Sequence, residues 1–205
     1  MTPPALKFSY FSFSGRGEIT RLALVYGGIP FEDDRVDFVT FGELKQTCPL
    51  GQLPLLEVDD KTFPQSMAIA RYAGRLAGIY PTDPLAALKV DVVLETMMEL
   101  LVEVVQFVHH NMEAAEKEKK RSELTKARLP QIYSSIEKHV EGEYLLGNVI
   151  SLGDLHLFDI TSNMVQPNFP DFDLASFPKV QGIINAVAST PSIAKYMAER
   201  PTPQF

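Results

Sequence analysis

The sequence contains one cysteine, no run of 18 apolar residues and no excess of basic residues. With Cys48 as its single thiol the chain cannot form an internal disulfide, which is typical of proteins from reducing compartments. The missing apolar run argues against a membrane-spanning helix. The net charge of −7 argues against nucleic acid as a partner, because binding phosphates needs a basic surface. Residues 1–4 lack the pattern of a secretory signal, so we expect a soluble cytoplasmic protein.

The chain has 205 residues, which is enough for one large domain or two small ones. Its character changes at the proline-containing segment Gly78–Pro84. Before Pro81 there are 8 basic and 9 acidic residues, and from there on 11 basic and 17 acidic residues. We therefore treat the two parts separately.

The N-terminal part mixes strand and helix patterns. The expected elements are a strand over 6–10, a helix over 18–26, an edge strand with a loop over 30–38, a weak helical turn over 40–47, a hairpin of strands over 53–58 and 61–63, and a helix from 66. This order predicts an α/β domain with a mixed sheet.

The C-terminal part contains no convincing strand. We expect long helices over 85–109 and 116–140, a kink or early break at Pro130, a helix after Ser151 and further helices near Phe177 and Ser192. Ser151-x-x-Asp154 fits a variant of the capping box. The chain is thus predicted to join a small α/β domain to a larger all-helical domain.

Tyr10 ends the first strand and faces the turn Gly15-Arg16-Gly17, where the first helix opens. Open α/β sheets bind ligands outside the ends of their strands. Tyr10 is therefore the first candidate for the chemistry. Cys48, between Thr47 and Pro49, lacks the basic neighbour that a nucleophilic thiol needs.

Four motifs resemble those of the cytosolic glutathione transferases, and most closely their sigma class, which includes haematopoietic-type prostaglandin D synthases and lens S-crystallins. They are Tyr10-Phe11 with Gly15–Glu18, Gly51–Asp59, Gln65–Tyr72, and Gly147-Asn148 with Ser151 and Asp154. The resemblance implies a thioredoxin-like, glutathione-binding domain over residues 1–80 and a linker over 81–84. It also implies an all-helical domain over 85–205 that carries the electrophile pocket, and a homodimer.

Glutathione has two carboxylates, two amides and a thiol, and the resemblance assigns each a partner. The first carboxylate is placed at Gln65 and Ser66, where a helix N-terminus favours an anion. The resemblance also implies a cis peptide bond before Pro54. This bond would turn the N–H and C=O of Leu53 toward the cysteinyl backbone of glutathione, so that the two backbones pair as neighbouring strands do.

The glycyl end of glutathione is expected near Phe41, Lys45 and Gln52. Sigma-class sequences often have a tryptophan where Phe41 stands and a lysine where Gln52 stands. Phe41 lacks the indole N–H donor, which predicts weaker affinity for glutathione.

Tyr10 stands at the family's catalytic position. A neutral phenol that donates to the glutathione thiolate lowers the pKa of the thiol by about 1–2 units. Arg16 adds positive potential, and no covalent enzyme intermediate is needed. Ser9, Ser12 and Ser14 remain alternatives, because some transferase classes use a serine.

The resemblance also brings Glu99 to glutathione from the other subunit. We expect no metal, because Met98 interrupts the acidic residues around Glu95 and Glu99, and no cofactor besides glutathione as co-substrate. Hydrophobic electrophiles are expected in a pocket lined by Phe13, Leu101, Val105, His156, Ile160 and Phe205.

The expected function is conjugation of the glutathione thiolate to hydrophobic electrophiles, a detoxification reaction. One alternative is a glutathione-dependent isomerase of the prostaglandin type. Another is a non-catalytic, ligandin-like or crystallin-like binder, although a structural role would not require Tyr10, Arg16, Gln65 and Ser66.

Overall fold

The structure, a computed structural model, describes residues 4–201. The chain divides into two compact units. The first comprises the residues up to Tyr80 together with the segment from Thr190 onward, and the second is Pro81–Ser189. The division into 1–80 and 85–205 that the resemblance implies remains a prediction. Helix α10 (Pro191–Glu199) belongs to the first unit because it packs against α1 (Glu18–Tyr26).

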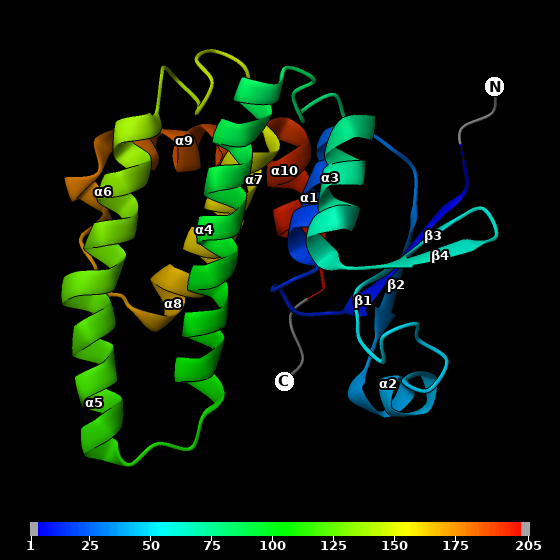
Figure 1. The fold of residues 1–205 in the computed structure, drawn as a ribbon, viewed down its shortest axis with the longest axis horizontal. Coiled ribbons are helices and arrows are strands. Elements are labelled where there is room, and N and C mark those ends of the chain that lie inside the picture. Colours follow the sequence, from blue (N-terminus) through cyan, green and yellow to red (C-terminus); the bar gives the residue numbers. More distant parts are fainter. Residues whose placement is uncertain (1–3, 202–205) are drawn as a thin grey trace. The chain divides into compact units, whose positions relative to one another are not determined.

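The first unit contains a four-stranded mixed sheet in the order β2-β1-β3-β4 (Figure 1). Its strands are β1 (Leu6–Phe11), β2 (Glu32–Val36), β3 (Leu55–Val58) and β4 (Lys61–Pro64). β1 runs parallel to β2 and antiparallel to β3, which forms a hairpin with β4. The mixed sheet that the sequence predicts is confirmed.

Helices α1 and α3 (Ser66–Leu76) pack against each other beside this sheet (Figure 1). Ile19 and Leu22 of α1 and Ile69 of α3 are buried, as their helical spacing predicts. The short helix α2 (Phe38–Leu44) begins where the carboxylate of Asp37 accepts the Thr40 N–H at 2.7 Å. It overlaps the segment 40–47, where a weak helical turn was expected, but begins two residues earlier and ends three residues earlier.

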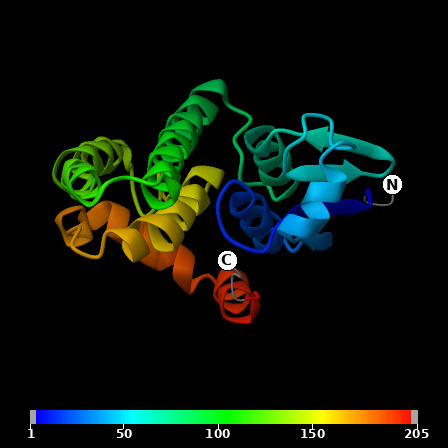
Figure 2. The same ribbon diagram turned by 90° about the horizontal axis from the view of Figure 1, so that it is seen from below.

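The second unit is helical (Figure 2). Its elements are α4 (Pro84–His109), α5 (Ala114–Glu123), a π-helical segment (Leu124–Arg128), α6 (Leu129–His139), α7 (Leu152–Ile160), a second π-helical segment (Thr161–Val165), α8 (Gln166–Asn168), a 3-10 turn (Leu174–Ser176) and α9 (Pro178–Ser189). Within residues 4–201, none of the helices has the length and apolarity that crossing a membrane requires.

Two prolines account for the π-helical segments. Pro130 has no N–H to donate to the carbonyl of residue 126, and the expected kink takes the form of a wider turn directly before α6. Pro167 stands in the same relation to the segment Thr161–Val165. The first interruption was predicted from Pro130, and the second was not predicted.

The capping box at the start of α7 is confirmed. Asp154 Oδ2 accepts the backbone N–H of Ser151 at 2.7 Å and its hydroxyl at 2.6 Å. Asp154 Oδ1 accepts the N–H of Leu145 at 2.9 Å. The carboxylate is fully buried, so these three donors satisfy a group that would otherwise be costly to bury.

Candidate active site

Tyr10 is held by the turn that follows its strand. Its side chain is 5% exposed, and its Oη accepts the backbone N–H of Arg16 at 3.1 Å. A Cβ at Gly17 would lie 2.2 Å from the ring, and a Cβ at Gly15 would lie 3.0 Å from Oη. Gly15 also has a φ of +141°, a backbone conformation that residues with a side chain rarely adopt. Both glycines are therefore needed for the turn to close around the phenol.

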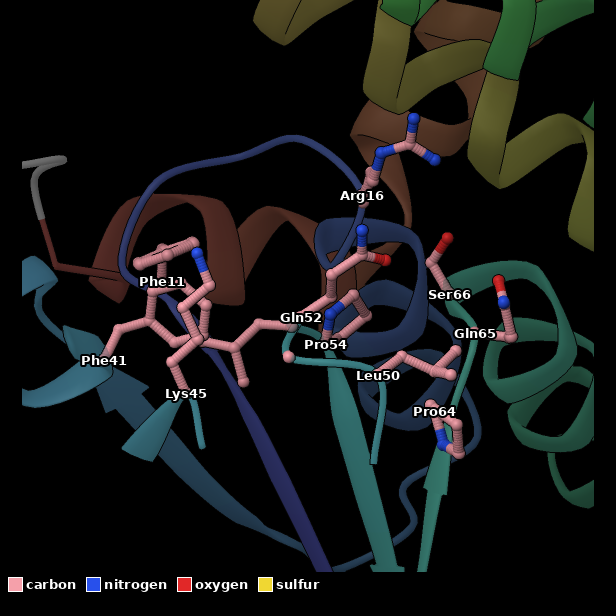
Figure 3. Close-up of a pocket in the computed structure, with 12 residues that line it drawn as sticks. Phe11, Arg16, Phe41, Lys45, Leu50, Gln52, Pro54, Pro64, Gln65 and Ser66 are labelled. Atoms are coloured by element: carbon pink, nitrogen blue, oxygen red, sulfur yellow. The ribbon is translucent and has the colours of Figure 1, made fainter. Parts of the chain in front are cut away.

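A cavity of about 430 Å³ opens in the first unit beside this turn (Figure 3). Its volume lies in the range of small-molecule binding sites. It is lined by Phe11, Arg16, Phe41, Lys45, Leu50, Gly51, Gln52, Leu53, Pro54, Pro64, Gln65 and Ser66. Eight of these were named from the sequence, namely Arg16, Phe41, Lys45, Gln52, Leu53, Pro54, Gln65 and Ser66. Tyr10 does not line the cavity, whereas Phe11 and Arg16 do.

One end of the cavity is the start of α3. Ser66 is the first residue of the helix and is buried. The free N–H groups of the first helical turn and the helix dipole favour an anion at this end of the cavity. Gln65, just before it, has φ 80° and ψ 100°, a conformation that is unfavourable for a residue with a side chain. Strain of this kind is found where function requires a particular backbone geometry.

The middle of the cavity is formed by Gln52 and Pro54 (Figure 3). The peptide bond between Leu53 and Pro54 is cis, as the resemblance implied. β3 begins at Leu55, so this bond lies at the end of the sheet. An extended backbone laid alongside Leu53 would continue the pattern of strand pairing.

Comparisons with known proteins agree with this geometry. The sequence profile described as "Glutathione S-transferase, N-terminal domain" matches residues 6–75, and that described as "Glutathione S-transferase, C-terminal domain" matches residues 98–200. "Glutathione S-transferase 1" of Ascaris suum is 32% identical over 97% of this chain and 98% of its own length. The chain belongs to the glutathione S-transferase family.

Two further relatives show which members of the family this chain resembles. "Hematopoietic prostaglandin D synthase" of Rattus norvegicus is 29% identical over 97% of this chain and 98% of its own. The solved structure of Na-GST-3, a glutathione S-transferase of Necator americanus described as monomeric, has a TM-score of 0.88. It is 27% identical and covers 98% of this chain and 100% of its own. The thioredoxin-like N-terminal domain and the sigma-class likeness are thereby confirmed.

The other end of the cavity contains Lys45 and Phe41, two of the three positions assigned to the glycyl end of glutathione (Figure 3). Phe41 meets Phe11 edge to face, with ring centroids 5.4 Å apart. Phe11 in turn stacks on Phe13 at 5.1 Å, and Phe38 lies 4.9 Å from Phe11. Phe41 thus packs against a cluster of aromatic rings.

The residues named for the electrophile pocket fall in different places. Phe13 belongs to the first unit, and Leu101, Val105, His156 and Ile160 to the second. Leu101, His156 and Ile160 are buried, Val105 is 37% exposed, and Phe205 lies outside the described residues. Their role as a pocket remains a prediction.

His156 and Glu99 illustrate two different environments in the second unit. Burial lowers the pKa of His156 to about 3, although its Nδ1 is 3.9 Å from Asp159 Oδ2. The imidazole is therefore neutral at physiological pH. Glu99 is exposed on α4 and pairs with Arg128 at 3.4 Å.

Sequence reasoning missed four residues that line the cavity, Phe11, Leu50, Gly51 and Pro64. Three of them adjoin a residue that was named, since Phe11 follows Tyr10, Gly51 precedes Gln52, and Pro64 precedes Gln65. Phe11 and Gly51 lie within the motifs given above and Pro64 directly before one, so taking each motif whole and extending it by one residue would have found them. Leu50, directly before the Gly51–Asp59 motif, would have been found in the same way.

Proposed function

We propose that this protein conjugates the thiolate of glutathione to hydrophobic electrophiles, and that the Tyr10 hydroxyl donates a hydrogen bond to this thiolate. The observation that supports this most is the single cavity in which a helix start, a cis peptide bond and a lysine surround one space. These are three different binding elements, for an anion, an extended backbone and a second anion. A tripeptide with a carboxylate at each end and amides between them matches that order.

In this proposal glutathione lies along the cavity with one carboxylate at Gln65 and Ser66 and the other near Lys45. The two ends then use different attractions, backbone N–H groups at the helix start and a side-chain cation at Lys45. Leu53 pairs with the cysteinyl backbone, which directs the thiol toward the end of β1. Gln52 adds a hydrogen-bond donor near the glycyl end.

The reaction then depends on the thiolate. The phenol oxygen of Tyr10 accepts the Arg16 N–H, which polarises its O–H and makes the hydrogen a better donor to an anion. A hydrogen bond to a charged group contributes about 1.5–3 kcal/mol, enough to keep most of the thiol ionised near neutral pH. The thiol proton leaves to solvent, and the sulfur attacks the electrophilic carbon to form the C–S bond as the leaving group departs.

The decisive experiment compares the wild type with Tyr10→Phe. We expect the variant to fold and to bind glutathione with similar affinity, while kcat/KM for a chlorinated nitrobenzene falls about 10- to 100-fold at neutral pH. The pKa of the bound thiol, followed by the ultraviolet absorbance of the thiolate, should rise by about 1–2 units. A fully active Tyr10→Phe would contradict the mechanism, and Ser9→Ala, Ser12→Ala and Ser14→Ala would then be tested.

A second candidate function is isomerisation of a prostaglandin-type substrate, because a relative of similar length is named hematopoietic prostaglandin D synthase. The two activities share the thiolate and differ in the substrate. Assaying the isomerisation of a prostaglandin endoperoxide beside conjugation separates them. A protein that binds glutathione and performs neither reaction would be the crystallin-like binder.

The proposal includes a homodimer that acts in detoxification in the cytoplasm. Leu85, Leu88 and Val92 are 62%, 58% and 47% exposed at helical spacing on α4, a face suited to a second subunit. Glu99 lies further along the same helix. Sedimentation at micromolar concentration tests this. We expect a dimer that Leu88→Glu dissociates, and a wild-type monomer would contradict the proposal.

A further inference from the structure

Five side chains of the first unit form a closed network that we call the Glu18 network, made of Glu18, Arg21, Asp33, Arg35 and Tyr196. Arg21 Nη1 lies 3.4 Å from Glu18 Oε2, and Arg21 Nε donates to Asp33 Oδ1 at 2.7 Å. Asp33 Oδ2 accepts from Arg35 Nε at 2.8 Å, and Arg35 Nη2 donates to Tyr196 Oη at 3.2 Å. Tyr196 Oη donates to Glu18 Oε1 at 3.0 Å, which closes the circuit.

Glu18 and Arg21 are the buried charges of this network, whereas Asp33 and Arg35 are partly buried. Arg21 is 0% and Glu18 1% exposed, and Arg200 gives Glu18 a further cation at 2.6 Å. A buried ion is tolerated only when its partners are well placed, and losing one partner leaves an uncompensated charge. The geometry of each member therefore depends on the others.

Two members of the network also hold the backbone around the catalytic tyrosine. Arg21 Nη2 lies 3.4 Å from the carbonyl oxygen of Tyr10, and Arg35 Nη1 donates to that of Ser12 at 3.2 Å. Glu18 itself begins α1 directly after Gly17, which lies against the Tyr10 ring. The network thus fixes the chain before and after the loop that carries the phenol.

We propose that the Glu18 network is a positioning device for Tyr10 and that Tyr196, on the C-terminal helix α10, is its closing residue. Tyr196 acts through Arg35 and Glu18 and is a positioning residue for the thiolate-stabilising hydrogen bond. This inference rests on the function proposed above. Only a group that donates and accepts at once can serve at Tyr196, because its oxygen accepts from a guanidinium and donates to a carboxylate.

The chemistry of Tyr196 fits this role. Burial raises the pKa of its phenol, and the neighbouring Glu18 raises it further. The hydroxyl therefore stays protonated at every pH at which the enzyme would be assayed. Burial opposes the charged form of Arg35, but Tyr196 and Asp33 together raise the pKa of its guanidinium. Arg35 therefore also stays protonated and donates to Tyr196 over the same pH range.

The test is Tyr196→Phe, which removes one oxygen and keeps the ring. We expect a folded protein that binds glutathione within about twofold of the wild type, with the pKa of the bound thiol raised by roughly 0.5–1 unit. kcat/KM at neutral pH should fall about three- to tenfold and recover at alkaline pH, where the thiol ionises without help. An unchanged thiol pKa, or an equal loss at every pH, would overturn the inference.

Two comparisons make the outcome specific. Tyr26→Phe removes a hydroxyl from a partly buried tyrosine of the same unit and should leave the thiol pKa unchanged. Arg35→Lys keeps the charge but loses the planar fork, and should raise the thiol pKa without adding fully to Tyr196→Phe. Fully additive effects would mean that the two residues do not act through one network.

Tyr10→Phe, measured alongside, separates the two proposals. If Tyr10→Phe raises the thiol pKa and Tyr196→Phe does not, the positioning role is wrong and the proposed function stands. If Tyr10→Phe itself leaves the thiol pKa unchanged, both proposals fail.

Discussion

Gly17 lies directly against the aromatic ring of Tyr10. A Cβ at residue 17 would come within 2.2 Å of Cδ1, 2.4 Å of Cγ and 2.9 Å of the Tyr10 Cβ. No side chain can be added there unless the ring or the turn moves. The position of the phenol therefore depends on the absence of a side chain seven residues later.

This contact predicts a large effect of Gly17→Ala. The methyl group should displace the ring and reduce kcat/KM about tenfold or more, since displacements of about 1 Å have large effects on catalysis. It should also lower the free energy of unfolding by about 1–3 kcal/mol through overpacking. Steady-state kinetics at a temperature well below the unfolding transition measure the first effect, and urea unfolding the second.

Gly182→Ala is the matched control for that substitution. A Cβ at Gly182, in α9, meets nothing within 4 Å, so the alanine should stabilise the helix by about 0.5–1 kcal/mol and leave the activity unchanged. Equal behaviour of the two variants would show that Gly17 is not constrained by Tyr10.

Gln65 allows strain and binding to be separated. Gln65→Ala removes the amide and keeps a side chain at φ 80°, whereas Gln65→Gly removes the amide and relieves the strain. Both should weaken glutathione binding about tenfold, and the glycine variant should be more stable than the alanine variant by about 1 kcal/mol. Calorimetric titration and thermal unfolding measure the two quantities. Equal stabilities would show that the backbone at this residue carries no strain.

The departures from the sigma-class pattern predict a gain of affinity. Phe41→Trp introduces an indole N–H and Gln52→Lys adds a cation, both at positions assigned to the glycyl end of glutathione. Each should lower the dissociation constant of glutathione about three- to tenfold, with the effect of Gln52→Lys decreasing as salt is added. Thr62→Lys adds the same charge on exposed β4, away from the cavity, and should have no effect. Unchanged affinity in both variants would mean that glutathione does not approach this end.

Much of the fold could be predicted because it follows local rules. Apolar alternation predicted β1, the spacing of Ile19 and Leu22 predicted α1, and the pair Ser151 and Asp154 predicted the start of α7. The cavity residues came from the resemblance, because each motif is a short segment that folds in one way. Leu50 was missed because it lies one residue outside the Gly51–Asp59 motif, in a loop without a helix or strand pattern.

What could not be predicted depends on contacts between distant segments. Tyr196 looks like an ordinary helix residue, and only the folded chain brings its hydroxyl to Glu18, 178 residues earlier. The same contact explains why α10 joins the first unit. Arg21 gave no sign of its full burial, because an arginine on a helix is usually exposed.

His156 predicts how the stability of the second unit depends on pH. Its pKa is about 3 in the folded protein and about 6.5 in an unfolded chain, so unfolding takes up a proton below pH 6.5. Stability should therefore fall as the pH decreases from about 6.5 toward 3, and His156 should account for about 1 kcal/mol between pH 7 and 5.5. His156→Leu should remove that part of the pH dependence, as measured by urea unfolding at the two pH values. His109→Leu, at an exposed histidine, should retain it. Identical pH dependence in the wild type and His156→Leu would show that the buried imidazole is not the group that titrates.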